Sequence, residues 1–86
     1  MAISAARVTV GTSAVALNTA STSAQDLLLK NTSANAADLG ASTVTATTGF
    51  DLAAGATVAV SVDAGDVLYA IRSGGSDATI AVLRQV

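Results

Sequence analysis

The segment from residue 49 to residue 71 constrains the fold more than any other part of the chain. Within it, Val58, Val60 and Val62 alternate with small or hydroxylated residues, which is the two-residue period of a strand with one buried face. The sequence Asp-Ala-Gly-Asp at positions 63–66 is typical of a tight turn, and a second apolar run follows it. This strand–turn–strand unit predicts an all-β protein.

Similar short runs of Val, Leu, Ile and Thr recur along the chain, separated by Gly, Asn, Asp and Ser. They predict a small β-sandwich or jelly-roll-like barrel of about seven to eight short antiparallel strands. Residues 36–39 also fit a helical turn closed by Gly40, but the surrounding pattern favours a strand. We expect strands at residues 7–10, 14–18, 25–31, 36–39, 43–47, 56–62, 67–72 and 78–84.

Two of these strands carry further information. In residues 25–31, Leu27 and Leu29 face one way, while Asp26, Leu28 and Lys30 face the other. Residues 78–84 are apolar on both faces, as expected for a strand that is central in a sheet or covered at an interface. The residues expected in the core or at an interface are Phe50, Leu52, Val58, Val60, Tyr69, Ile71, Ile80 and Val82.

The chain is small and lacks the usual covalent supports. Its 86 residues make a single domain, residues 1–86, in which residues 1–7 are either an N-terminal arm or a frayed end. There is no Cys for a disulfide, no His or Cys for a structural zinc, and no Pro to protect edge strands. A core of this size leaves little stability to spare, so we expect association with other chains.

The charge pattern argues against some classes of binding partner. The net charge is −2, and the four basic residues are scattered at Arg7, Lys30, Arg72 and Arg84, so no basic patch for nucleic acid is visible. Only 12% of residues are charged, which suggests that other protein covers part of the surface. No apolar run is long enough for a membrane helix and no signal peptide is visible, so we expect a protein made in the cytoplasm, with no membrane partner.

Most catalytic schemes lack their residues. With no His, Cys or Glu, a Ser nucleophile has no imidazole base, and Lys30 is the only lysine. We therefore expect no enzymatic activity, no cofactor and no small-molecule substrate. Asp63 and Asp66, with Asp51 upstream, would suit a carboxylate pair or a weak Ca²⁺ site, but a turn is the favoured interpretation because a calcium cage needs more oxygen ligands.

The two aromatic residues, Phe50 and Tyr69, allow two interpretations. They could form a platform for a ligand, or they could be large core residues, which we favour because aromatics dominate burial. Leu28 is an apolar residue on a mostly polar face and gains meaning only if Leu83 or Val86 lies beside it. The residues expected at an interface are Arg7, Leu28, Arg84 and Val86.

Several motifs along the chain resemble one family. They include V-x-V-G-T at residues 8–12, L-L-x-N at 28–31, T-G-F-x-L-x-x-G at 48–55 and D-x-L-Y-A-I at 66–71. This pattern resembles small virion structural proteins of tailed bacteriophages, of the head-decoration type. The motif positions are Gly49, Phe50, Leu52, Gly55, Asp66, Leu68 and Tyr69.

The resemblance implies a function. Such a protein would bind the major capsid protein on the outer capsid surface, as a trimer made in the host bacterial cytoplasm, and would stabilise the shell by bridging subunits. The alternatives are a tail, fibre-base or head–tail joining component, or a small carbohydrate-binding module. The last alternative would gain weight if either aromatic side chain were exposed.

Overall fold

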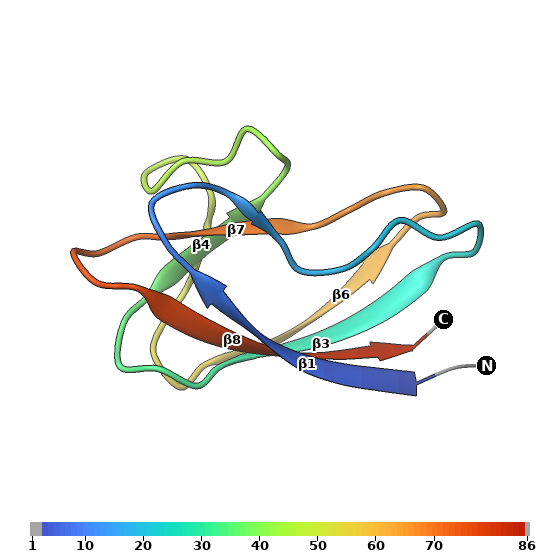
Figure 1. The fold of residues 1–86 in the computed structure, drawn as a ribbon, viewed down its shortest axis with the longest axis horizontal. Helices are drawn as coiled ribbons and strands as arrows, with labels where there is room; N and C mark the ends of the chain where they lie inside the picture. Colours follow the sequence, from blue (N-terminus) through green and yellow to red (C-terminus); the bar gives the residue numbers. More distant parts are fainter. Residues whose placement is uncertain (1–2, 86) are drawn as a thin grey trace.

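The computed structural model describes residues 3–85, and over this range the protein is all-β, as predicted, with no helix. The strands are β1 (Ile3–Val10), β2 (Val15–Ala16), β3 (Gln25–Asn31), β4 (Ala37–Gly40), β5 (Phe50–Leu52), β6 (Thr57–Val62), β7 (Tyr69–Arg72) and β8 (Ala78–Gln85). They form two four-stranded antiparallel sheets, in the orders β1-β8-β3-β6 and β2-β7-β4-β5. In Figure 1 the sheet with β1, β3 and β8 lies below the sheet with β4 and β7.

The strand pairing follows a single rule. β1 pairs with β8, β2 with β7, β3 with β6, and β4 with β5, so the chain is one long hairpin whose tip is the β4–β5 connection. Folding this hairpin over itself adds the β3–β8 and β4–β7 contacts and divides the strands between two sheets. This arrangement of eight strands is that of a jelly roll.

The core lies between the two sheets and consists of aliphatic side chains. β3 is buried and exposed at alternate residues, so Leu27 and Leu29 point inward, as predicted. β6 alternates in the same sense, with its valines inward. The predicted core residues Leu52, Ile80 and Val82 are buried, and Val58 and Val60 pack against them from partly buried positions. β8 is central in its sheet, between β1 and β3, which agrees with its two apolar faces.

Three of the residues expected in the core or at an interface lie outside the core. Phe50 is 63% exposed and is not a core residue, because β5 is a three-residue edge strand and Phe50 is its first residue. Tyr69 and Ile71 are half-buried and lie outside the core cluster. Both lie on the outer face of their sheet, since Ile71 is opposite Asp38 while the neighbouring Ala70 points into the core.

Two segments also differ. Residues 43–47 are not a strand but part of a chain of turns, in which the Val44 N–H donates to Ala41 O and the hydroxyls of Thr45 and Thr48 are 2.8 Å apart. Such local bonds from Thr side chains compete with strand pairing. At the N-terminus, β1 begins at Ile3 rather than residue 7, so residues 3–7 lie in the sheet. The first two residues of the arm expected at 1–7, and the predicted interface residue Val86, lie outside the described residues.

Candidate functional site

The outer face of the β1-β8-β3-β6 sheet carries an apolar row that crosses all four strands. Leu28 on β3 lies directly opposite Leu83 on β8, and the register extends the pair to Ala5 on β1 and to Ala59 on β6. We call Ala5, Leu83, Leu28 and Ala59 the apolar row. Leu28 is 44% exposed and Leu83 45% exposed, so no loop of residues 3–85 covers them.

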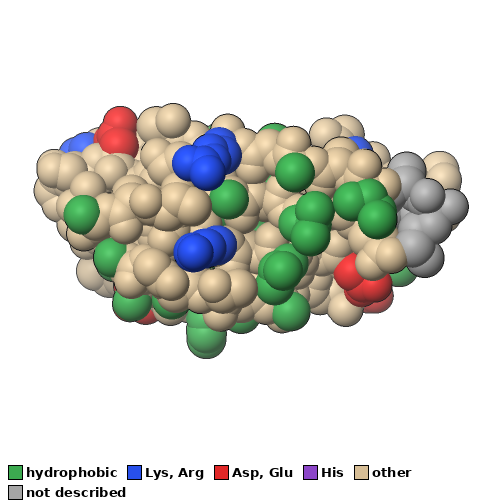
Figure 2. Space-filling view, turned by 90° about the horizontal axis from the view of Figure 1, so that it is seen from below, with side chains coloured by type: hydrophobic (Ala, Val, Ile, Leu, Met, Phe, Trp, Pro, Cys, Tyr) green, Lys and Arg blue, Asp and Glu red, His purple; other side chains and the backbone are tan. Residues whose placement is uncertain are grey.

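Charged side chains flank the apolar row on both sides. One step along the strands, Arg7 on β1 and Lys30 on β3 lie on either side of Ala81. One step in the other direction, Asp26 accepts a 2.9 Å hydrogen bond from the hydroxyl of Ser61. Figure 2 shows this face, with hydrophobic side chains gathered between basic groups and an acidic group.

The face is slightly hollowed beside the leucines. A shallow groove of about 610 Å³ is bounded by Leu28 and Leu83 on one flank and by Arg7 and Lys30 on the other. The expected interface residues Arg7 and Leu28 thus share one surface. Leu83 lies beside Leu28, which was the condition under which Leu28 would be informative.

The outer face of the second sheet is different, because residues 41–49 lie against it. A methyl group added at Gly49 would lie 2.6 Å from Val44 Cγ2 and 2.7 Å from Asp38 Cβ, so the loop passes too close for any side chain. Val44 is buried by this contact. Position 49 therefore requires a glycine because of close packing, whereas Gly55 has a φ of 76°, a backbone conformation that glycine adopts readily in turns.

This loop also buries an acid. Asp38 on β4 is 4% exposed and lies opposite Asp51 on β5. Burial raises the pKa of Asp38, the hydrogen bond and negative charge of Asp51 raise it further, and the bond from the Gly49 backbone acts in the opposite direction. The raised pKa favours a neutral Asp38, whose carboxyl O–H can donate the hydrogen bond to Asp51.

Buried amide side chains close the two ends of the sandwich. Asn31 is fully buried, and its Nδ2 donates to Asn35 O at 2.7 Å and to Leu52 O at 3.1 Å, while its Oδ1 accepts from the hydroxyl of Ser33. Asn31 therefore joins β3 to β5 of the opposite sheet. The sequence motif included Asn31, but nothing in its local pattern indicated this role.

Asn18, in the connection between β2 and β3, also joins distant segments through its side-chain amide. Its Oδ1 accepts from the Leu68 N–H at 2.7 Å and its Nδ2 donates to Asp66 O at 3.2 Å. The turn of residues 63–66 is closed by the Asp66 N–H, which donates to Asp63 O, and Gly65 has a φ of 85°. The Asn18 side chain thus holds this turn through backbone groups of Asp66 and Leu68, two of the motif residues.

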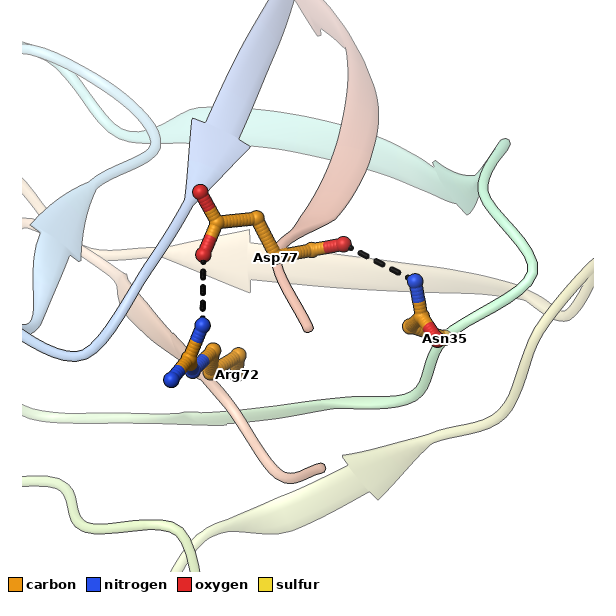
Figure 3. Close-up of polar contacts among 3 residues, drawn as sticks. All are labelled: Asn35, Arg72 and Asp77. Carbon is orange, nitrogen blue, oxygen red and sulfur yellow. Dashed lines mark hydrogen bonds and ion pairs between the residues drawn. The ribbon is translucent and has the colours of Figure 1, made fainter. Parts of the chain in front are cut away.

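A polar cluster joins three segments at one end of the sandwich. Arg72 Nη1 lies 2.9 Å from Asp77 Oδ1, and Asn35 Nδ2 donates to Asp77 O at 3.0 Å (Figure 3). The Arg72 N–H also donates to Gly11 O. Asp77 is mostly exposed, so this ion pair contributes little stability, and its main effect is to orient the β7–β8 connection.

Arg84, the remaining interface candidate, does not share the face of Arg7 and Leu28. It lies opposite Ser4, lines a separate hollow of about 310 Å³ together with Asn18 and Thr19, and its Nε is buried without a hydrogen-bond partner among the described residues. A third hollow, of about 430 Å³, adjoins Asp63 and Asp66. The exposed Phe50 lines none of these three.

Within residues 3–85, no group of three or more His, Cys, Asp or Glu side chains is placed to hold a metal ion, and no helix is suited to crossing a membrane. No protein-family model matches the chain, and no similar protein was found among curated proteins or solved structures.

Proposed function

We propose that this protein is a non-enzymatic structural component of a tailed-phage particle, which decorates the outer capsid surface and stabilises the shell by bridging major capsid subunits. The observation that carries the proposal is the uncovered apolar row on the outer face of one sheet. In a chain with so few charges, such a face is suited to contact with other protein.

Two further arguments support the virion as its location. The motifs at residues 48–55 and 66–71 resemble those of head-decoration proteins, and their residues shape the β5 edge and the β6–β7 turn. The jelly roll is also a fold of many viral capsid domains, although a fold alone does not determine function.

The mechanism is cementing through several weak contacts. A protein that assembles with its own copies presents several shell-binding surfaces at once, and multivalency then holds it on the particle. Because it binds only the assembled shell, it stabilises that state by mass action. Phe50, which projects from the edge strand β5, is a candidate contact for the shell.

The experiment compares phage particles with and without the protein. We expect particles that lack it to rupture at a lower temperature, and the purified chain added back should restore the rupture temperature. Identical rupture in both preparations would remove the cementing role. A copy number of a dozen or fewer per particle, measured by cryo-electron microscopy, would instead assign the protein to the tail, the fibre base or the head–tail junction.

The exposure of Phe50 favours a second candidate, a small carbohydrate-binding module. Exposed aromatic rings stack on sugars, and jelly rolls include lectins. Against it, Phe50 lies outside the three hollows described above. Binding of glycans by the native chain, lost in Phe50→Ala and kept in Tyr69→Phe, would favour this candidate over capsid decoration.

A further inference from the structure

The charges around the apolar row make the outer face of the β1-β8-β3-β6 sheet complementary to itself. We propose that this face binds the same face of a second copy, about a two-fold axis that runs along the apolar row. This inference rests on the proposal that the protein functions by self-assembly, and it names the partner of the face.

The register determines what such an axis brings together. Rotation about the apolar row keeps each strand opposite the same strand of the second copy and reverses the direction along the strand. Asp26 lies one step before Leu28 on the outer face and Lys30 one step after it. Each Asp26 therefore faces Lys30 of the second copy, and each Leu28 faces its own counterpart.

The other two-fold arrangement is electrostatically poor. If the axis ran along the strands, the row that contains Arg7 and Lys30 would lie on the same row of the second copy. Four cations would then share one line, and the two Asp26 carboxylates would lie together at the other side. Like charges placed together across an interface disfavour binding, so the charge pattern selects the first axis.

The available area is sufficient for such a pair. The longest strands of the sheet have eight residues, or about 27 Å at about 3.4 Å per residue, and four strands span about 19 Å. Pairing would therefore cover about 500 Å² on each copy and about 1,000 Å² in total, which is near the lower limit of a specific interface. Two sheets that pack face to face with nearly aligned strands are a standard arrangement.

The second sheet offers no equivalent surface. Its outer face is already covered in part by residues 41–49, with Val44 buried against Gly40 and Gly49. The pairing thus uses the one sheet face that the described chain leaves open. It also replaces the trimer implied by the resemblance with a two-fold pair.

Charge reversal provides a direct test. Asp26→Lys gives a face with cations on both sides of the row, and Lys30→Asp gives a face with acids on both sides. Each variant alone should associate at least 10-fold more weakly than the native chain, because like charges then face each other. An equimolar mixture of the two variants should form a heterodimer with at least the native affinity, because positions 26 and 30 then again pair a cation with an acid across the interface.

The measurement is sedimentation equilibrium of the native chain and the variants from micromolar to millimolar concentration. Both side chains are exposed, so circular dichroism and melting curves should show that the variants fold. Asp66→Lys makes the same charge change in the exposed β6–β7 connection, which belongs to neither sheet, and should leave the association unchanged.

Several results would overturn the pairing. These are a native chain that stays monomeric, a trimer as the smallest assembly, reversals without effect, and a mixture that does not associate. The proposed function is judged separately, from the rupture temperature of the particle. A monomeric chain that still raises that temperature would overturn the two-fold pair and leave the cementing role standing.

Discussion

Replacing Asn31 with Asp tests whether one buried amide holds the two sheets in register. The Asn31 Nδ2 group donates to Asn35 O at 2.7 Å and to Leu52 O at 3.1 Å, and the side chain is fully buried. Asn31→Asp keeps the shape but places an oxygen against two carbonyl oxygens. The introduced carboxyl must therefore take up a proton in the folded state, and even then it can donate to only one of the two carbonyls.

The size of the effect follows from this geometry. Keeping a carboxyl protonated at pH 7, when its pKa in the unfolded chain is about 3.9, costs about 4 kcal/mol. The lost hydrogen bond adds about 1 kcal/mol. At pH 4 the first contribution falls to about 0.5 kcal/mol, because the unfolded chain is then partly protonated as well. We expect Asn31→Asp to reduce the free energy of unfolding by about 5 kcal/mol at pH 7 and by about 1.5 kcal/mol at pH 4.

The assay is urea denaturation of native and variant chains at both pH values, followed by far-ultraviolet circular dichroism. Asn35→Asp is the matched control, because the Asn35 side chain makes a single surface hydrogen bond to Asp77 O. Its loss should be about 1 kcal/mol at both pH values. A loss for Asn31→Asp that is equal at pH 4 and pH 7, or no larger than that of the control, would refute the role assigned to this amide.

Three further predictions concern stability. Asp38→Asn should raise the melting temperature at neutral pH. Because the pKa of Asp38 is raised in the folded state, the contribution of this group to stability is fully present below its unfolded value of 3.8 and is lost as the pH rises through the folded pKa. The melting temperature of the variant should therefore fall less with rising pH than that of the native chain. An unchanged slope would contradict the burial argument. Gly49→Ala should cost about 1–3 kcal/mol, because the new methyl meets Val44 and Leu39 O within 2.8 Å, whereas Gly74→Ala, with open space around it, should be nearly neutral in urea titrations. Equal losses of stability in the two variants would mean that residues 41–49 shift at little cost to accept the added methyl group. Leu29→Ala should cost about 2–5 kcal/mol and Leu28→Ala, measured on dilute protein, less than about 1 kcal/mol, since Leu29 is fully buried and Leu28 is 44% exposed; a reversed order in denaturation would contradict the assigned faces of β3.

Local patterns were sufficient to predict the strands with strong alternation. The strand at residues 25–31 was predicted with the observed bounds, and the one at 56–62 differed by a single residue. In both, large aliphatic residues recur every second position, and the inward face then follows directly. The turn at 63–66 was also predicted correctly, because its glycine marks a position that needs a positive φ, and Gly65 adopts one.

The errors arose where distant contacts decide the outcome. β1 extends back to Ile3 because β8, at the other end of the chain, supplies its partner, and residues 3–6 carry no alternation of large side chains. Phe50 was misplaced because the edge position and short length of β5 leave its ring exposed. Residues 43–47 have strand-forming types, but their hydroxyls bond locally and Val44 packs onto two glycines instead.

The apolar row could be anticipated only in part. The sequence shows Leu28 as an apolar residue on a polar face, but its pairing with Leu83 depends on the register between β3 and β8. Nothing local in either strand specifies that register. The same holds for the buried Asn31 and Asn18, whose partners come from other parts of the chain.

The nested pairing of the strands has a consequence for the order of folding. The β4–β5 tip joins residues close in sequence, whereas β1 and β8 pair residue 3 with residue 85 and must close the longest loop. Closing longer loops is entropically less favourable and slows folding, so a chain that zips from its tip completes the β1–β8 edge last. The sheet face with the apolar row exists only after that step. A chain still emerging from the ribosome, or truncated before β8, therefore lacks this sheet face, and the pairing proposed above would require the last strand to be in place.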